Sequence, residues 1–241
     1  MTILTIELDK PVSMKPLEAV DAFRSQIIPI GEAVGACDLF NWSETKSPPI
    51  VYARPFKNRL RLIGISPEGA DAVESILSLV QGIGEFVFDG VRHKIANAYV
   101  ENQQYLPRSS NKKLFYKTGA PMLFFTGARR KVYEGIEKTY GRDETKIKEY
   151  IKTYSLEMIR EDIQKKLCDY YGERNYSFVE KIELEWVEYS MSLLPFHKDE
   201  KLTPGIKGVL KTNFFLPPFI GKKSGKGFGE ILNIKGVKHV A

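Results

Sequence analysis

The sequence predicts an α+β protein made of two ferredoxin-like domains in tandem, each with the order βαββαβ, and a C-terminal glycine-rich loop. Segments with the two-residue period of strands alternate with segments that have the 3.6-residue period of helices. The chain has 241 residues, which suits two small domains, and 43% of them are hydrophobic. A polar stretch that includes Pro107 separates the predicted domains, which span residues 1–105 and 112–241.

The first half reads as β-α-β-β-α-β with one additional strand. One helix is expected over 16–28, where Pro16 suits its first turn and Pro29 is expected to stop it. A second helix is expected over 67–82, after the capping residue Ser66. Asp89-Gly90 is a strong signal for a hairpin turn. The expected strands are 2–8, 50–56, 59–65, 85–88 and 91–100, and residues 30–48 are expected to be irregular.

The second half gives a related order, β-α(α)-β-β-loop-β. Residues 101–112 are polar and are expected to form a linker or an exposed loop. Helical periodicity runs over 128–171 with an interruption near Gly141. This half resembles the first with its second helix lost or replaced by the loop, although no residue-level repeat supports a duplication. The expected strands are 114–125, 178–194, 207–216 and 230–234.

The glycine-rich loop spans residues 217–230 and contains four glycines and three lysines. Apolar residues flank it on both sides, so it is expected to join two β-strands. That placement fits neither a P-loop nor a Rossmann loop, since both open a helix. Exposed N–H groups and lysines in such a loop favour an anionic ligand. A flexible hairpin loop without a ligand remains the alternative. The loop's predicted ligand-binding residues are Gly221, Lys222, Lys223, Ser224, Gly225, Lys226, Gly227 and Gly229.

Positive charge gathers around this loop. The formal net charge is +6 with a pI of about 9.1, and residues 201–241 hold eight lysines against one acid, Glu230. A local excess of this kind favours a polyanion such as nucleic acid, with a solvated lysine-rich end as the alternative. Further candidates for nucleic-acid binding are Lys207 and Lys211 on a predicted strand and Arg129, Arg130 and Lys131 at the start of a helix.

Other features narrow the class of protein. Cys37 and Cys168 have neither zinc spacing nor a disulfide framework, which indicates a reducing cytosol. The N-terminus is strand-like and lacks the features of a signal peptide. No apolar run approaches the roughly 18 residues that a membrane helix needs. We therefore expect a cytoplasmic protein that does not enter a membrane. No cluster of carboxylates or histidines has ligand spacing, so neither a metal nor a cofactor is expected.

The C-terminal region carries a spaced motif whose members are Asn213, Leu216-Pro217, Ile220-Gly221, Lys223-Ser224 and Gly227-Phe228-Gly229. This motif resembles that of the RAMP superfamily of CRISPR-associated proteins, and within it the repeat-RNA processing endoribonucleases. The N-terminal half is similar more loosely, through Pro49-Ile-Val-Tyr52 and the segment Leu62 to Gly69.

This resemblance implies an enzyme that binds the CRISPR repeat in precursor RNA and cuts it once, without a metal, to give guide RNAs. The ribose 2′-OH would attack the adjacent phosphate and leave a 2′,3′-cyclic phosphate and a 5′-OH. That step needs a base, an acid and positive charge on the developing phosphorane. The implied partner is repeat RNA, as a stem-loop or a single strand, with other CRISPR effector subunits or a homodimer as further possibilities.

The catalytic residues depart from the family's pattern. Many members use a histidine in or just after the first helix, but residues 28–47 contain none. The candidates here are His93 as a base, Tyr52 as a hydrogen-bonding group, and Lys46 as a cation near the phosphorane. Each residue type is more often structural or solvated than catalytic, so two other readings stay open. One is a non-catalytic RAMP subunit that binds guide RNA in an effector complex, and the other is an unrelated RNA- or ligand-binding protein.

Overall fold

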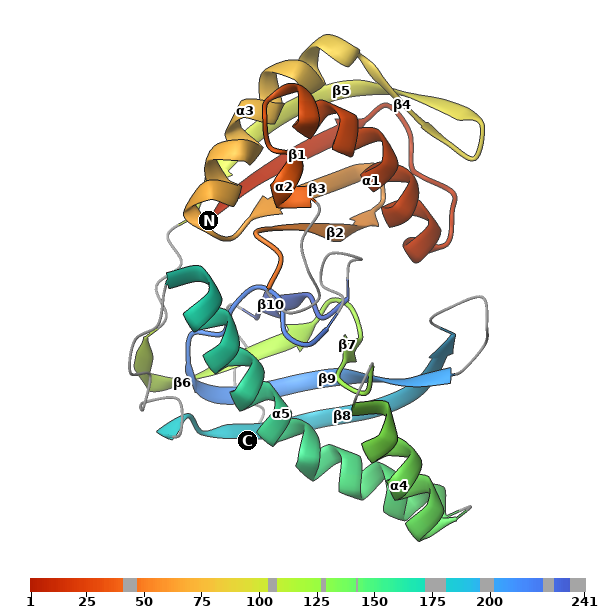
Figure 1. Ribbon diagram of the computed structural model, residues 1–241, viewed down its shortest axis with the longest axis vertical. Coiled ribbons are helices and arrows are strands. Elements are labelled where there is room, and N and C mark those ends of the chain that lie inside the picture. The colour runs from red at the N-terminus through yellow and green to blue at the C-terminus, as the bar shows by residue number, and fades with distance from the viewer. Residues whose placement is uncertain are drawn as a thin grey trace. The chain divides into compact units, whose positions relative to one another are not determined.

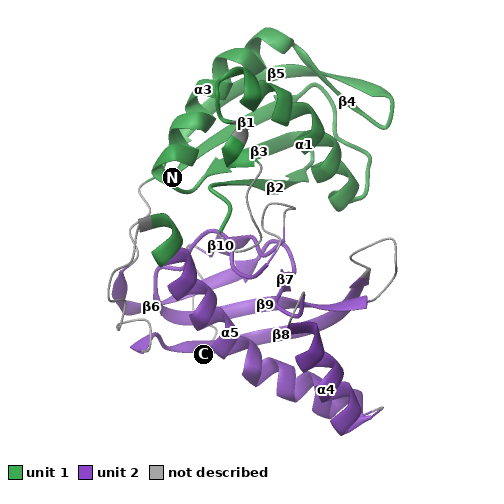
Figure 2. Cartoon of the chain, in the orientation of Figure 1, with its two compact units in different colours: residues 1–105, 168–174, 224–227 green, residues 106–167, 175–223, 228–241 purple. Residues whose placement is uncertain are grey.

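The computed structural model describes residues 1–40, 47–103, 108–126, 129–141, 143–171, 181–195, 202–222 and 228–234. Within these residues the chain forms helices and two antiparallel five-stranded sheets (Figure 1), which confirms the predicted mixture of α and β structure. The chain divides into two compact units (Figure 2). Unit 1 comprises residues 1–105, 168–174 and 224–227, and unit 2 comprises the remainder.

Unit 1 is a single antiparallel sheet with two long helices on one face. The sheet order is β2-β3-β1-β5-β4, so the first strand lies in the middle. The helices α1 and α3 both pack on this sheet (Figure 1). The elements are β1 (Thr2–Leu8), α1 (Pro16–Ala33), α2 (Cys37–Phe40), β2 (Ile50–Phe56), β3 (Arg59–Gly64), α3 (Pro67–Ile83), β4 (Glu85–Phe88) and β5 (Val91–Asn102).

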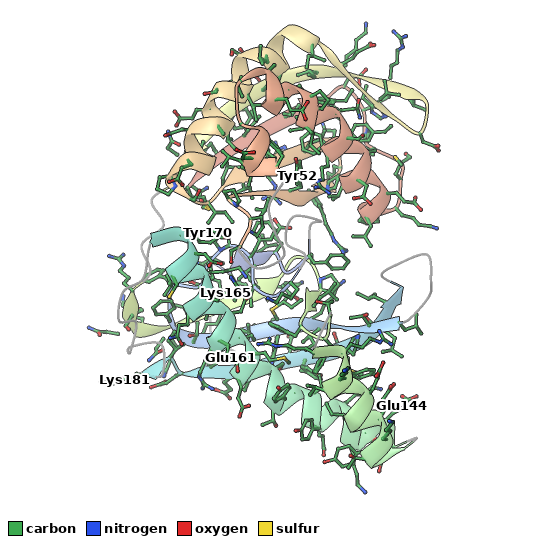
Figure 3. The ribbon with its side chains drawn as sticks, in the orientation of Figure 1. Tyr52, Glu144, Glu161, Lys165, Tyr170 and Lys181 are labelled. Carbon is green, nitrogen blue, oxygen red and sulfur yellow. The ribbon has the colours of Figure 1, made fainter. Side chains whose placement is uncertain are left out.

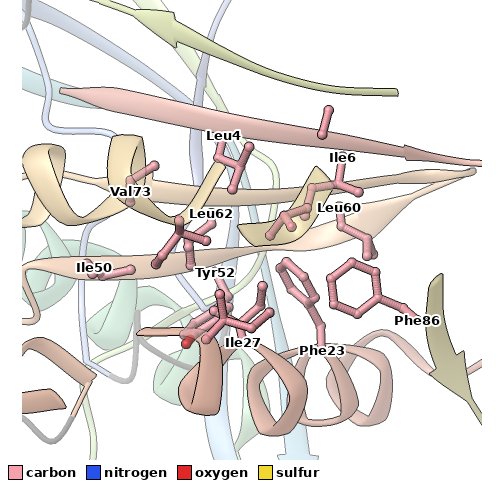
Figure 4. Packing of buried hydrophobic residues seen from close by; sticks show 14 of the residues in the cluster. Leu4, Ile6, Phe23, Ile27, Ile50, Tyr52, Leu60, Leu62, Val73 and Phe86 are labelled. Atoms are coloured by element: carbon pink, nitrogen blue, oxygen red, sulfur yellow. The ribbon is translucent and has the colours of Figure 1, made fainter. Parts of the chain in front are cut away.

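Aromatic side chains organise the core of unit 1 (Figure 4). Phe23 of α1 meets Tyr52 of β2 and Phe86 of β4 edge-on, with ring centroids 5.8 and 5.6 Å apart. Such edge-to-face pairs are favourable because the positive ring edge meets the negative ring face. Leu4 and Leu62 come from the neighbouring strands and are fully buried. The helical and strand periods that the sequence shows therefore converge on one core.

The first helix does not stop at Pro29, as the sequence predicted, but continues to Ala33. Proline removes one backbone hydrogen bond from a helix interior. Packing of the next turn offsets the lost hydrogen bond, because Ile30 and Gly31 are buried. Gly31 lies so close to the ring of Phe40 that an added Cβ would come within 2.2 Å of it. The segment 30–48, expected to be irregular, also contains the short helix α2.

Unit 2 has a central strand, β9, with β8 along one edge and β6 and then β7 along the other. The strand β10 pairs with the outer edge of β6. Two consecutive helices, α4 and α5, come between β7 and β8. The elements are β6 (Ser109–Thr118), β7 (Met122–Leu123), α4 (Arg130–Tyr140), α5 (Glu144–Tyr171), β8 (Leu184–Pro195), β9 (Leu202–Phe214) and β10 (Ile231–Asn233).

Several strand limits differ from those predicted. The expected strand 114–125 is two strands, because Gly119 to Pro121 interrupt the pairing with β9. The first of these strands begins at Ser109, which pairs with Phe214, so the predicted linker 101–112 is too long. The strand predicted to start at Lys207 starts at Leu202. Cross-strand pairing sets these limits, and it joins residues about 100 positions apart in the sequence.

The helix α5 packs on one face of the unit 2 sheet. The Trp186 indole N–H of β8 donates a hydrogen bond of 2.9 Å to Ser155 Oγ of α5. The Arg160 side chain donates one of 3.2 Å to the carbonyl of Ile182, just before β8. The buried apolar side chains of α5 include Ile151, Ile159 and Ile163. None of the helices that the structure describes is long and apolar enough to cross a membrane.

Candidate nucleic-acid interface

The two ends of the glycine-rich loop are held together by backbone hydrogen bonds in unit 2. Ile220 N donates to Gly229 O (2.9 Å), and Gly229 N donates to Pro121 O (2.9 Å). Lys222 N donates to Leu123 O (2.7 Å), at the end of β7. The loop therefore leaves and returns through a β-like stem, as its apolar flanks predicted.

Two glycines of this stem are required by geometry. Gly229 has φ +76° and lies against the backbone of Ile220, where a Cβ would come within 1.8 Å of the carbonyl oxygen. Gly221 has φ +92°, and its Cβ would lie 2.9 Å from Leu123 O. Side chains are strained at positive φ, so both positions favour glycine whatever the loop binds. Their predicted role in contacting RNA stays a prediction.

A buried ion pair on α5 fixes the start of the loop. Lys166 and Asp162 are one helical turn apart, both are almost fully buried, and the ammonium contacts the carboxylate. Asp162 Oδ2 also accepts a hydrogen bond of 2.8 Å from Gly221 N, and Lys166 Nζ donates one of 3.3 Å to Gly221 O. The pair thus satisfies both polar groups of one loop residue. Buried charges need this kind of pairing to be tolerated.

Lys222, the next residue, lies in a positively charged environment. Partial burial is the main cause that lowers the pKa of its ammonium, and Asp162 opposes the shift. The positive charges of Lys165, Arg129 and Lys166 lower this pKa further. We call Arg129, Lys165 and Lys222, with the Asp162–Lys166 pair beneath them, the Lys222 cluster. A phosphate here would relieve the mutual repulsion of these cations, because it adds the opposite charge.

The three residues of the predicted basic group 129–131 have different surroundings in the structure. Arg129 precedes α4, and its guanidinium forms an ion pair with the Glu161 carboxylate of α5. Glu161 and Lys165 project from successive turns of α5 (Figure 3). Arg130 instead contacts Glu134 at 3.2 Å and donates to the carbonyl of Leu202 at 3.1 Å. Lys131 is exposed. Of the three, Arg129 is the one that contributes to the Lys222 cluster.

Lys207 and Lys211 lie on the opposite face of the sheet. Leu210 of β9 is buried and pairs with Trp186, whose indole meets α5. Because neighbouring strand residues face opposite sides, Lys211 and Lys207 point away from α5. Lys211 Nζ donates to Glu185 Oε2 at 2.8 Å, and this bond, with the lysine charge, lowers the pKa of the Glu185 carboxyl. The predicted RNA-binding lysines of unit 2 therefore form two groups on two faces of its sheet.

The remaining loop candidates, Lys223, Ser224, Gly225, Lys226 and Gly227, lie outside the described residues, as does the catalytic candidate Lys46. Their predicted roles stay predictions.

The other two catalytic candidates belong to the interior of unit 1. His93 is 3% exposed, its Nδ1 lies 3.3 Å from the carbonyl of Lys10, and its ring meets Phe88 edge-on. Tyr52 is 2% exposed, and its hydroxyl has no hydrogen-bond partner in the described part of the chain. Burial raises the pKa of the Tyr52 phenol, and nearby Arg24 offsets part of this rise. Catalysis by either residue remains a prediction, and in this structure neither side chain meets solvent.

Sequence reasoning missed Asp162, Lys165 and Lys166. The Asp162 to Lys166 spacing is one helical turn, which on a surface helix predicts an ordinary ion pair. Nothing in the local pattern indicates that this pair is buried under Gly221. Among the described residues, no group of three or more histidines, cysteines or acids could hold a metal ion.

Comparison with known proteins places this geometry in a recognised fold. No protein-family model matches the chain, and no curated protein matches its sequence. Solved structures do match over almost the whole length. The crystal structure of Cas6b aligns with 97% of this chain and 100% of that one, at 18% identity and a TM-score of 0.68.

Two further solved structures share the fold over a similar part of the chain. A CRISPR RNA processing endoribonuclease, also Cas6b, covers 97% of this chain and 100% of its own, at 17% identity and a TM-score of 0.57. A RAMP protein binding different RNA substrates covers 98% and 100%, at 14% identity and a TM-score of 0.62. These matches confirm the predicted resemblance to RAMP endoribonucleases at the level of the fold.

Proposed function

We propose that this protein binds CRISPR repeat RNA in precursor transcripts and cleaves it to give guide RNAs. The observation that carries the proposal is the fold similarity to a CRISPR RNA processing endoribonuclease over 97% of the chain. In this proposal the two units are two ferredoxin-like domains, the second of which has replaced a helix by the glycine-rich loop.

The Lys222 cluster supports the binding half of this proposal. It combines a loop stem fixed by the buried pair with cations from a loop, a helix and the start of another helix. Lysine and arginine neutralise RNA phosphates and release counterions, which supplies affinity that is independent of sequence. On the other sheet face Lys207 is exposed and Lys211 is paired with Glu185, and we propose that a longer RNA reaches these lysines and competes with that carboxylate.

The chemistry in this proposal needs no metal. The 2′-oxygen forms a bond to the adjacent phosphorus as a base takes its proton, and the bond from phosphorus to the 5′-oxygen breaks as an acid protonates it. The products are a 2′,3′-cyclic phosphate and a 5′-OH. We assign the stabilisation of the phosphorane charge to Lys46. His93 and Tyr52 are buried, so we expect them to act as base or hydrogen-bonding group only if unit 1 opens locally.

The test is a cleavage assay in EDTA with a labelled repeat RNA from the same genome and a twin that carries a 2′-deoxy ribose at the cut. The proposal predicts one cut in the native RNA, none in the twin, and a cyclic phosphate at the new 3′ end. Cutting of the twin would contradict the 2′-OH mechanism. Arrest by EDTA that Mg²⁺ reverses would contradict metal independence.

A non-catalytic RAMP subunit that binds guide RNA is the second candidate function. The observation that favours it is the burial of both described catalytic candidates. Tight binding of repeat RNA, with no cleavage of either twin at protein excess, would select this alternative.

A further inference from the structure

An open groove lies between α4 and the first half of α5 in unit 2. It encloses about 490 Å³, which is within the range of roughly 300–1,000 Å³ for small-molecule sites. Its walls combine aromatic rings with charged groups. The lining side chains include Tyr140, Tyr150, Tyr154, Glu149, Glu157 and Lys146.

The tyrosines form a continuous ladder. The centroids of Tyr150 and Tyr154 are 6.0 Å apart with their planes inclined by 29°, and Tyr140 of α4 lies 6.0 Å from Tyr150. Tyr154 continues the ladder to the buried Phe125, at 6.2 Å. The inner end is therefore anchored in the core, while Tyr150 keeps 43% of its surface exposed. The exposed Tyr150 ring, with Tyr154 beside it, offers an aromatic surface in the groove on which a planar ring can stack.

The charges in the groove favour a nucleobase over a phosphate. Glu149 and Glu157 are acids of the groove wall that repel an anion. Lys146 does not reverse this, because its ammonium lies 3.3 Å from the carboxylate of Asp143. A carboxylate does accept hydrogen bonds from an exocyclic amino group, as glutamate does from N4 of cytosine. Uracil has no such group. The groove thus suits an unpaired base that carries an amino group.

The groove and the Lys222 cluster share one helix and one side of it. Tyr154, Glu161 and Lys165 are separated by seven and four residues, so they form one stripe along α5. The eleven residues from Tyr154 to Lys165 rise roughly 16 Å. At about 3.4 Å per stacked nucleotide, this spans roughly five nucleotides.

We propose that the α4–α5 tyrosine groove binds an unpaired, amino-bearing nucleobase of an RNA whose backbone the Lys222 cluster holds about five nucleotides away. This rests on the proposed function only in taking RNA as the ligand. Aromatic side chains stack on bases of single-stranded RNA in this way, and alanine substitution of one platform typically costs about tenfold in affinity or more.

The test measures fluorescence anisotropy at fixed salt with the full chain. The probes are a repeat RNA with single-stranded tails of zero to ten nucleotides, and free hexanucleotides of C, A or U. We expect affinity to rise about tenfold once the tail passes roughly five nucleotides for C and A tails, and to rise less for U tails, which stack but lack the amino group. Tyr150→Ala should abolish this gain and leave the untailed RNA unaffected. Tyr150→Phe should keep it, because stacking needs the ring.

Two controls distinguish loss of stacking from misfolding of the variant, and the groove proposal from the proposed function. Tyr99→Ala removes a tyrosine from unit 1 and should leave the tail gain intact, and Tm values report folding of each variant. If Tyr150→Ala binds every tailed RNA like the wild type, the groove is not a base site, even though repeat RNA still binds. If the hexanucleotides bind in a Tyr150-dependent way but repeat RNA is not preferred, the proposed function fails and the groove stands. Binding of a protein instead of any RNA through Tyr150 overturns the groove proposal.

Discussion

The two units place their candidate functional side chains in opposite environments. In unit 1 the described candidates, Tyr52 and His93, are part of the core and meet aromatic rings. In unit 2 the candidates Lys222 and Arg129 are half-buried, on a loop stem and a helix end that buried hydrogen bonds and an ion pair hold in place. The contrast shows that the fold of unit 2 holds candidate cations where a ligand can reach them, whereas the fold of unit 1 places its described catalytic candidates in the core.

The largest effect should come from breaking the buried pair in unit 2. Asp162→Ala leaves Lys166 as a buried charge without its carboxylate and frees Gly221 N, so we expect a loss of about 3–5 kcal/mol in the free energy of unfolding. Urea denaturation measures it. The matched control replaces both charges, as Asp162→Leu with Lys166→Met, and should recover much of the stability. A small loss in the single variant would show that the loop stem does not depend on this pair.

The next effect tests whether chemistry resides in the core of unit 1. We expect Lys46→Ala to slow single-turnover cleavage by about 100-fold or more, since one charged stabilising group commonly contributes that much. Tyr52→Phe removes a buried hydroxyl for which the described residues offer no partner, and should change the cleavage rate less than about threefold, with stability kept or slightly increased. If Tyr52→Phe slowed cleavage more than Lys46→Ala, catalysis would depend on the core residue Tyr52, and unit 1 would have to open around bound RNA.

The substitution Lys222→Met tests whether the Lys222 cluster binds RNA phosphates. If Lys222 contacts a phosphate as proposed, affinity should fall equally for all repeat sequences, and the slope of log K against log salt should shrink by roughly 0.7–0.9. Lys211→Met on the other sheet face is the matched comparison. An unchanged slope for Lys222→Met would remove this lysine from the interface.

The same Lys222→Met variant has a smaller effect on stability, of opposite sign. Folding lowers the pKa of Lys222, so the unfolded chain holds this proton more tightly. The charge therefore costs stability below the lowered pKa, and the cost disappears as the pH rises toward the ordinary lysine value of about 10.4. Because the side chain is only partly buried, we expect the variant to be slightly more stable than the wild type at neutral pH and no more stable above about pH 11. Thermal denaturation across this pH range measures it.

Periodicity predicted the two long helices and the five strands of unit 1, because these follow local patterns, but not the short helix α2. It failed where packing overrides a local signal. Pro29 lies inside a helix because Ile30 and Gly31 are buried beyond it. The limits of β6 and β9 depend on pairing between distant residues such as Ser109 and Phe214.

The candidate site was predictable to the same extent. Glycine and lysine content located the loop, and its stem at Gly221 and Gly229 has the expected strand-like exit. The sequence could not show that Lys207 and Lys211 face away from Lys222, since that follows from how the sheet packs on α5. It also could not show that Asp162 and Lys166 are buried, because their spacing is equally typical of a surface pair.

The most direct test of the central claim, that unit 2 holds the RNA phosphates at the Lys222 cluster, is cross-linking mass spectrometry. Repeat RNA would be cross-linked to the unmodified chain by ultraviolet light, and the attached peptides identified after digestion. We predict cross-links in peptides that contain Arg129, Lys165 or Lys222, and their loss in Lys222→Met at moderate salt. Cross-links that are confined to peptides of residues 1–103, and that are unchanged in Lys222→Met, would contradict this claim.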